Sequence, residues 1–259
     1  MSLVKRTGAA GAALPYPLQT ILGPAGTARQ FLSPVWYQHL GLYWFFEDFL
    51  FDEAPDDLPW TAYDKSAAGS PTVGLVASGT GGQWQMKCAA TSEAETLAWY
   101  FNDNLPIRGN VPFLFACRAK VVHTMAANQV VVIGLGSALV DTFDDMTRNA
   151  WFKLDADADW NIEYDDNTTN VDDQDIGEDV VADTFYWFFI EFDGTELRFH
   201  LGSGDGQNIA SWNGPKNFSQ TEVAFGANNL QPFIAVQKAS GTTTPEVVLD
   251  LVAFCGVRV

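Results

Sequence analysis

An Asp-Gly dipeptide between two hydrophobic runs is the feature that most constrains this chain. Residues 184–201 read TFYWFFIEFDGTELRFHL, with Asp193-Gly194 between the runs. Asp-Gly flanked by alternating hydrophobic residues is a strong short-range signal for a β-hairpin, because both turn residues take positive φ. The first run is apolar on both faces, whereas the second alternates Leu197, Phe199 and Leu201 with polar residues. We therefore expect a strand buried inside a packed sheet beside a neighbour that meets water.

Short runs of β-branched and aromatic residues recur along the rest of the chain, separated by polar, Gly-rich turns. No amphipathic helix of useful length and no fixed-period repeat is evident. About a dozen short strands of this kind predict an all-β chain, folded as an antiparallel β-sandwich. Besides the hairpin, the predicted strands are 43–51, 72–77, 83–90, 96–101, 112–122, 129–135, 149–154, 160–164, 233–238 and 247–259.

Residues 1–45 are predicted to form an extended arm, and residues 46–259 the sandwich. Prolines at positions 15, 17, 24 and 34 exclude a helix or a central strand in the arm. The arm contains more aromatic and aliphatic residues than a disordered linker normally does. Because ordering a backbone costs roughly 1–2 kcal/mol per residue, we expect the arm to order against a partner chain, a neighbouring copy or its own sandwich. The predicted docking residues are Lys5, Arg6, Arg29, Phe31, Trp36 and Tyr37.

The charge of the chain is segregated. Residues 1–46 carry 3 basic and no acidic side chains, and the rest carries 11 basic and 32 acidic ones, so +3 and −21 sum to the net charge of −18. Such asymmetry is typical of an arm with its own partner. The acidic body argues against nucleic acid and anionic lipid as partners. No stretch of 18 apolar residues is present that would span a membrane.

The three cysteines, Cys88, Cys117 and Cys255, are far apart in the sequence, and each lies in a predicted strand. No C-x-x-C spacing is present, so the sequence indicates no zinc site. We predict buried free thiols, as in a protein that folds inside the cell.

The order of several segments resembles a known family. Phe46-Glu-Asp-Phe49 is followed by Gly81-Gly-Gln-Trp-Gln-Met, Phe113-Leu-Phe-Ala-Cys-Arg-Ala-Lys120, the hairpin, and Val248-Leu-Asp-Leu-Val252. Together they resemble the concanavalin-A-like lectin/glucanase jelly roll, in particular its versions in tailed-bacteriophage virion proteins. The resemblance covers roughly residues 46–259 and implies a jelly-roll sandwich. Members of that family serve as carbohydrate-binding lectins, as glycan hydrolases or as structural decoration, so the fold alone does not select the function.

An acidic run offers a candidate calcium site. Residues 155–183 contain twelve carboxylates and no Lys or Arg. Oxygen-bearing residues alternate at its start, which suits Ca²⁺ because this hard cation takes six to eight oxygen ligands. Trp160 stands where an EF-hand turn needs Gly, so the alternatives are a loop calcium site or a solvated acidic hairpin edge. The candidate ligands are Asp155, Asp157, Asp159, Asn161 and Glu163.

A second acidic set, Glu191, Asp193 and Glu196, echoes the paired carboxylates of glucanases with the resembled fold. Glycoside hydrolysis uses two such groups, one of them an acid. Asp193 lies in the predicted turn, so the set would sit at a hairpin tip without cleft walls. We therefore predict no catalytic residues and no enzymatic activity. Hydrolysis remains an alternative.

Aromatic side chains could instead stack on sugar rings. Most of the nine tryptophans in a sandwich of this size belong to the core, and the sequence does not separate the two groups. No residue is therefore assigned to a glycan contact. The candidates are Trp60, Trp84, Trp99, Trp160 and Trp212.

The predicted arm, the segregated charge and the family resemblance together predict a non-enzymatic structural protein of a tailed bacteriophage that decorates or cements the capsid. It would be a virion component assembled in the host cytoplasm, bound to the major capsid protein or another virion protein, and homo-oligomeric. No cofactor is predicted apart from possible calcium. The alternatives are a glycan-binding domain of a tail or fibre protein, which would bind a surface glycan, and a glycoside hydrolase.

Overall fold

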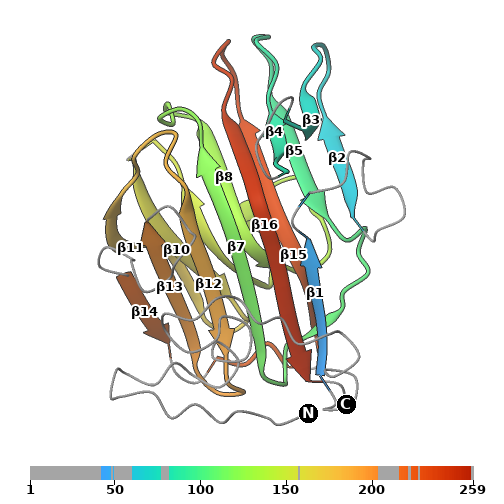
Figure 1. Cartoon of the computed structure of the whole chain (residues 1–259), viewed down its shortest axis with the longest axis vertical. Helices are drawn as coiled ribbons and strands as arrows, with labels where there is room; N and C mark the ends of the chain where they lie inside the picture. The colour runs from blue at the N-terminus through green and yellow to red at the C-terminus, as the bar shows by residue number, and fades with distance from the viewer. Residues whose placement is uncertain are drawn as a thin grey trace, which may run out of the picture.

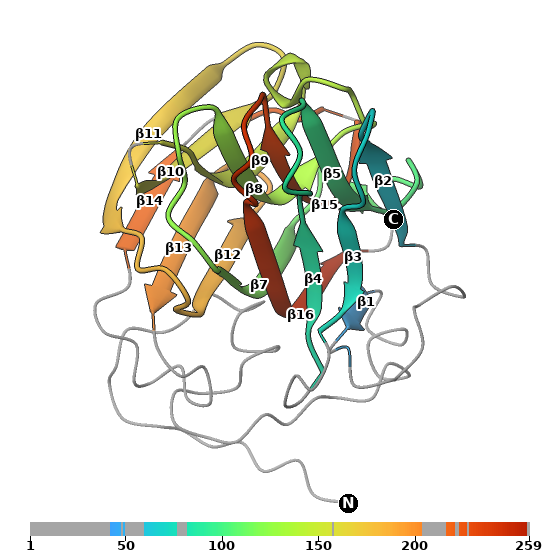
Figure 2. The same ribbon diagram turned by 90° about the horizontal axis from the view of Figure 1, so that it is seen from above.

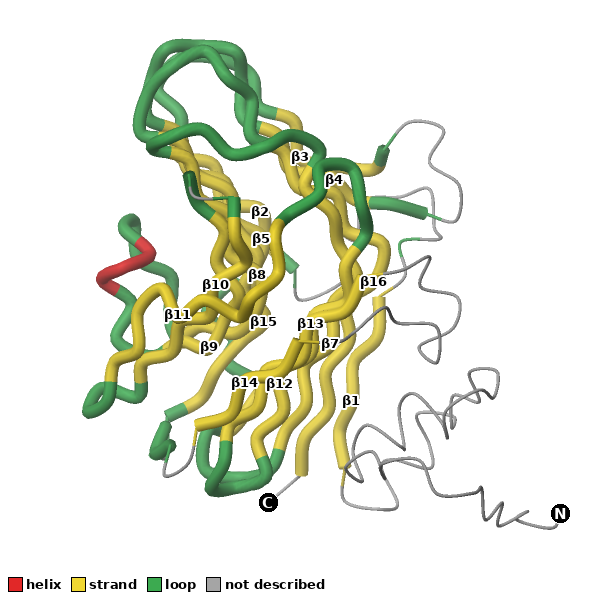
Figure 3. Tube along the Cα trace, turned by 90° about the vertical axis from the view of Figure 1, so that its left-hand side faces the viewer, coloured by secondary structure: helices red, strands yellow, loops and turns green. Residues whose placement is uncertain are grey.

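The computed structural model describes residues 42–47, 49, 60–76, 82–156, 158–203, 216–220, 223–226 and 228–257. In this part of the chain, two antiparallel sheets of eight strands pack face to face (Figure 1). The side view separates the two layers and places a short 3-10 turn, η1 (Phe143–Asp145), outside one of them (Figure 3). The predicted antiparallel β-sandwich is confirmed.

Sheet A has the strand order β14-β13-β12-β7-β16-β4-β3, with β1 beside β16. The predicted hairpin supplies β12 and β13, and β12 pairs on its other side with β7. The strands are β1 (Leu42–Glu47), β3 (Thr72–Leu75), β4 (Trp84–Lys87), β7 (Phe113–Val121), β12 (Tyr186–Phe192), β13 (Leu197–Ser203), β14 (Lys216–Gln220) and β16 (Glu246–Val257).

Sheet B has the order β11-β10-β9-β8-β15-β5-β2, with β6 beside β15. Seen from above, β11 and β14, the last strands of the two sheets, lie at the same side of the sandwich (Figure 2). The strands are β2 (Thr61–Lys65), β5 (Glu95–Tyr100), β6 (Ile107–Arg108), β8 (Gln129–Gly136), β9 (Asn149–Leu154), β10 (Asp159–Asp165), β11 (Asn170–Asp179) and β15 (Asn229–Lys238).

Hydrophobic side chains are buried on both faces of sheet A. The main core lies between the sheets and takes Phe188 and Ile190 from β12. Trp187 and Phe189, which alternate with them, point to the outer face of sheet A, where they join a second buried cluster with residues of β7 and β16. This double burial explains why β12 is a continuous apolar run and not an alternating one.

Strand β16 organises sheet A because it pairs along both edges. One edge pairs with β7, and the other pairs first with β4 and then with β1. Since β1 spans Leu42–Glu47, the sandwich already includes residues that the predicted boundary at residue 45 assigns to the arm. Residues 1–41 lie outside the described part of the chain.

The predicted strands and the observed ones agree best where hydrophobic residues dominate. The range predicted for β9, 149–154, is the observed one. Strands β2, β6, β11 and β14 were not predicted, because β6 has two residues and the sequences of the other three are polar. β11 pairs with β10 and forms the edge of sheet B, so the acidic run makes a charged hairpin edge, as one of the two alternatives expected.

The predicted buried thiols are confirmed. Cys88, Cys117 and Cys255 are buried and free of disulfides. Among the described residues, no helix has the length and apolarity needed to cross a membrane.

Gly134 of β8 provides a test of the packing on the outer face of sheet B. A Cβ atom there would lie 2.4 Å from the carbonyl oxygen of Ala150 and 2.6 Å from Cα of Trp151, so neither neighbour could yield without moving β9. We expect Gly134→Ala to lower the free energy of unfolding by about 1–3 kcal/mol in urea denaturation. Gly74→Ala is the control, because no atom lies within 4 Å of its Cβ position. Equal effects of the two substitutions would contradict the packing argument.

Candidate functional site

The predicted docking residues of the arm lie outside the described residues. Their role therefore stays a prediction. These residues are Lys5, Arg6, Arg29, Phe31, Trp36 and Tyr37.

The residues of the predicted calcium loop lie in a strand hairpin and not in a closed loop. Asp159, Asn161 and Glu163 occupy alternate positions of β10, and the residues between them turn into the inter-sheet core. Side chains two residues apart on a strand are about 7 Å apart in a row, which does not gather them around one ion. Glu163 pairs instead with Lys153, with 3.2 Å between Nζ and Oε2.

The other two candidate ligands lie close to this strand or outside the description. Asp155 belongs to the turn before β10, and Asp157 lies outside the described residues. Within the described part of the chain, no group of three His, Cys, Asp or Glu side chains is placed to hold a metal ion.

The tryptophans considered as a sugar platform are core residues wherever the structure describes them. Trp60, Trp84, Trp99 and Trp160 are all at most 6% exposed. Trp60 and Trp99 stack on each other with ring centroids 3.6 Å apart. The sequence could not separate them from exposed rings, because burial is decided by sheet packing. Trp212 lies outside the described residues.

The hairpin of β12 and β13 brings the second acidic set together. β12 ends at Phe192 and β13 begins at its pairing partner Leu197, so the connection is four residues long, from Asp193 to Glu196. Gly194 has φ of 104°, whereas Asp193 is not among the described residues with positive φ, so the expectation that both turn residues take positive φ was wrong. The reason is that Oδ1 of Asp193 accepts the backbone N–H groups of Thr195 and Glu196, at 3.0 and 2.8 Å.

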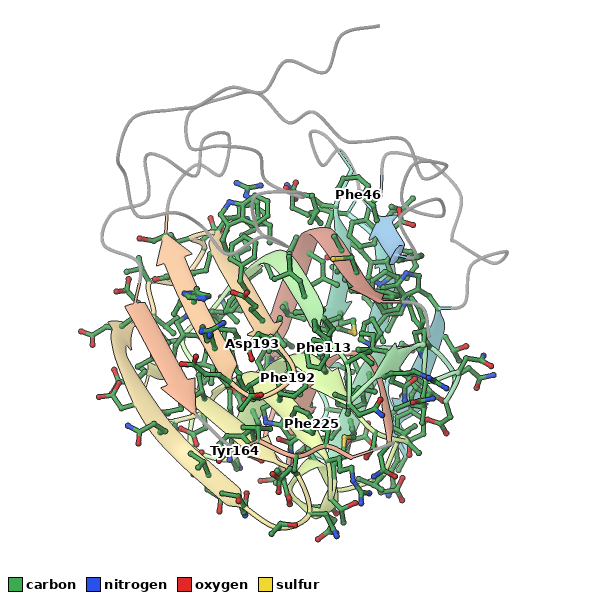
Figure 4. All side chains as sticks on the ribbon, turned by 90° about the horizontal axis from the view of Figure 1, so that it is seen from below. Phe46, Phe113, Tyr164, Phe192, Asp193 and Phe225 are labelled. Carbon is green, nitrogen blue, oxygen red and sulfur yellow. The ribbon has the colours of Figure 1, made fainter. Side chains whose placement is uncertain are left out.

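This connection lies at one end of the sandwich. Seen from below, Asp193 lies close to Phe113 and Phe192, with Phe225 nearby (Figure 4). The three rings are packed together, with centroids of Phe113 and Phe192 5.3 Å apart and those of Phe192 and Phe225 5.8 Å apart. They are at most 1% exposed and anchor the base of the hairpin in the core.

Three carboxylates converge on one guanidinium. Nη2 of Arg198 lies 2.6 Å from Oδ2 of Asp193 and also donates to Oε2 of Glu196. Nη1 lies 3.7 Å from Oε1 of Glu191, the residue paired with Arg198 across the strands. We call Glu191, Asp193, Glu196, Arg198 and His200 the hairpin cluster. The sequence singled out the three acids but not Arg198, whose role follows from the register of β12 against β13.

Glu191 is the buried member of the hairpin cluster. Its side chain is 2% exposed. It follows Phe189 by two residues on β12, so it lies on the same outer face of sheet A. Desolvation raises the pKa of Glu191 to about 7, partly offset by Arg198, while Asp193 and Glu196 raise it further. Its Oε2 accepts no hydrogen bond from a described residue.

His200 also belongs to this group and is not simply an exposed side chain. It follows Arg198 by two residues on β13, so both point to the outer face of sheet A. Its Nε2 lies 4.0 Å from Oε2 of Glu191, and its side chain is 22% exposed. The alternation of β13 places His200 on the polar face of the strand, and the pairing with β12 places it beside a buried acid.

Asp193 keeps its charge at the rim of the hairpin cluster. The backbone N–H of Glu196 lowers the pKa of Asp193, against some desolvation, and Arg198 lowers it further. The side chains of Asp193, Glu196 and Arg198 are 41%, 26% and 26% exposed, so this rim meets solvent. Chemically the cluster offers a guanidinium, two carboxyl groups at the rim and a buried acid, a set suited to hydrogen-bonding a polar ligand.

Comparisons by sequence find no relative. No protein-family model matches the chain, and no curated protein matches it.

Comparison of structures finds β-sandwiches of the same fold. The Emp47p carbohydrate recognition domain is 8% identical, with a TM-score of 0.52, over 81% of this chain and 93% of that one. The exoplasmic/lumenal domain of VIP36, in a Ca2+/Man2-bound form, is 8% identical, with a TM-score of 0.51, over 85% and 90%. The CBM2 module of an evolved Dit from Lactobacillus casei BL23 phage J-1 is 14% identical, with a TM-score of 0.50, over 83% and 95%. At these identities the likeness establishes the lectin/glucanase jelly-roll fold.

The raised pKa of Glu191 predicts a pH-dependent stability. The folded state keeps the proton up to about pH 7, whereas the unfolded chain loses it near the ordinary value of 4.5, so stability falls as pH rises between these values. The shift corresponds to about 3 kcal/mol. The wild type should therefore lose about this much free energy of unfolding between pH 4 and pH 8, and Glu191→Gln should not show this loss. Urea denaturation at the two pH values measures the difference.

The matched control is Asp172→Asn, at an exposed acid of β11 in the other sheet. Its stability should follow the wild type through the same pH range. If the free energy of unfolding depends on pH in the same way in the wild type and in Glu191→Gln, the burial of Glu191 does not raise its pKa.

Proposed function

We propose that this chain is a glycan-binding β-sandwich domain without catalytic activity, with the hairpin cluster as its sugar contact. The observation that carries the proposal is the convergence of Glu191, Asp193, Glu196 and Arg198 at the solvent-facing end of one sheet. Planar carboxylates and a guanidinium in fixed positions present the acceptors and donors that a sugar hydroxyl pair requires. The fold is shared with carbohydrate recognition domains, which makes a sugar the first ligand to test.

Binding fits the geometry better than hydrolysis. Both carboxylate oxygens of Asp193 are engaged, Oδ1 by two backbone N–H groups and Oδ2 by Arg198. Glu196 is tied to the same guanidinium. A retaining glycosidase needs one free carboxylate as nucleophile beside a protonated acid. Glu191 has the raised pKa of an acid, but the two carboxylates beside it are held by Arg198 and the turn.

We expect the protein to bind a subset of sugars on a glycan array, and Glu196→Gln to reduce the affinity at least about tenfold. The reason is that the substitution loosens Arg198 and removes a charged acceptor. Isothermal titration with the best array sugar measures the change, with and without added CaCl₂ to test the calcium prediction. Reducing-end release from the same sugar should remain at background.

The control for this experiment is again Asp172→Asn, which makes the same change of charge on the other sheet. It should bind like the wild type. Loss of binding in both variants would point to net charge and not to the hairpin cluster. Turnover of the sugar that disappears in Glu191→Gln would replace the binding proposal with the hydrolase alternative.

A virion role is the second candidate, and the segregated charge favours it. A basic segment of net +3 precedes a body of net −21. In this proposal the arm docks on the capsid or on a neighbouring copy, and many weak contacts around a symmetric lattice add up. The chain would then be a homo-oligomeric virion protein that presents the sandwich outward.

Deleting residues 1–41, which leaves β1 in place, should abolish binding to purified particles and leave glycan binding unchanged. Quantitative mass spectrometry of the particles gives the copy number relative to the shell protein. Hundreds of copies would support capsid decoration, and a few dozen would support a place in the tail or fibres. Absence of the protein from particles would end the virion proposal.

A further inference from the structure

The charge of the hairpin cluster is unbalanced. Asp193, Glu196 and Glu191 all lie near the single guanidinium of Arg198. The pKa of Asp193 is lowered, so this rim acid is ionised at neutral pH, and its side chain is 41% exposed. A ligand that approaches the rim from solvent therefore meets an excess of negative charge.

Arg198 is shared unequally among the acids. It forms close hydrogen bonds to Asp193 and Glu196 at the rim, but its nearest nitrogen stays 3.7 Å from Oε1 of Glu191. Oε2 of Glu191 accepts no hydrogen bond from a described residue, although the side chain is only 2% exposed. Such a buried, unsatisfied oxygen costs about 1–3 kcal/mol, so the hairpin cluster holds an acid that a second cation would stabilise.

We propose that the hairpin cluster binds a glycan bearing a protonated amine, and that Arg198 moves from the rim toward Glu191 when the ammonium group takes its place. This inference rests on the proposed glycan binding at the same site. It names the sugar class: 2-amino sugars with a free amine, in preference to N-acetylated or acidic sugars.

Charge and size support the exchange. An ammonium group is a compact cation with three donors, and it can replace the guanidinium between Asp193 and Glu196. Arg198 is then free to move the short distance inward and complete the pairing of Glu191. Two cations then face the three carboxylates, where one cation did before. The carboxylate of an acidic sugar would instead be repelled by the rim.

Among the residues that the structure describes, few groups face Glu191. Arg198 and His200 face it from β13, Asp193 and Glu196 from the connection, and β7 places the apolar Leu114 opposite it. Closer approach of Arg198 favours the ionised form of Glu191, whose pKa is otherwise raised to about 7. Binding near pH 7 should therefore release a proton from Glu191.

The test compares three six-sugar oligomers by isothermal titration at pH 7: one of glucosamine, one of N-acetylglucosamine and one of galacturonic acid. We expect the glucosamine oligomer to bind at least about tenfold more tightly than the N-acetylated one, and the acidic oligomer to bind weakest. Repeating the titration in two buffers of different ionisation enthalpy gives the protons released. The wild type should release up to about half a proton more than Glu191→Gln, because a group near its pKa is half protonated.

The outcomes separate this inference from the proposed function. Equal binding of the glucosamine and N-acetylglucosamine oligomers would overturn the amine preference and leave glycan binding standing. Binding of neither oligomer, together with a glycan array that shows no binding, would overturn both. A lysine hexapeptide that binds as tightly as the glucosamine oligomer would show recognition of amines and not of sugars, and would also overturn the inference.

The movement of Arg198 has its own readout. In the wild type, the ¹³C carboxyl resonance of Glu191 should titrate at lower pH when the glucosamine oligomer is bound, and this measurement does not depend on a variant that folds. An unchanged titration of Glu191, or equal proton release in wild type and Glu191→Gln, would overturn the proposed movement. Asp172→Asn should match the wild type in every titration.

Discussion

The central strands of sheet A are buried on both faces, and the rest of the molecule depends on this constraint. β7, β12 and β16 send alternate side chains into the inter-sheet core and into the cluster on the outer face. A polar side chain on these strands has little water available, so it must find a partner or stay neutral. Glu191, near the end of β12, favours the neutral form, because its buried place in the sheet raises its pKa.

The hairpin cluster arises where a strand buried on both faces meets one that is only half buried. β13 alternates Leu197 and Phe199 in the core with Arg198 and His200 on the outer face. Its register against β12 sets Arg198 opposite Glu191, and the turn then brings Asp193 and Glu196 to the same guanidinium. One cation is therefore shared among acids of different depth.

Sequence reasoning succeeded where hydrophobic periodicity and turn chemistry are strong. The runs that became β7, β9 and β12 were predicted because an apolar stretch between turn residues has few alternatives. The polar strands β11 and β14 were missed, because they gain their place by pairing and not by burial. For a related reason, Asp159, Asn161 and Glu163 lie on an extended strand. Trp160 and Ile162 between them are buried in the core.

By itself, the sequence determined the all-β class, the hairpin, the burial of the thiols and the segregation of charge between a basic N-terminal segment and an acidic remainder. These depend on composition, period and residues close in the chain. Only the tertiary structure decided which tryptophans are core, that β16 pairs along both edges, and that three carboxylates meet at Arg198 while one of them is buried. Burial and cross-strand contacts depend on register and on the packing of one sheet against another, and these join residues far apart in the sequence.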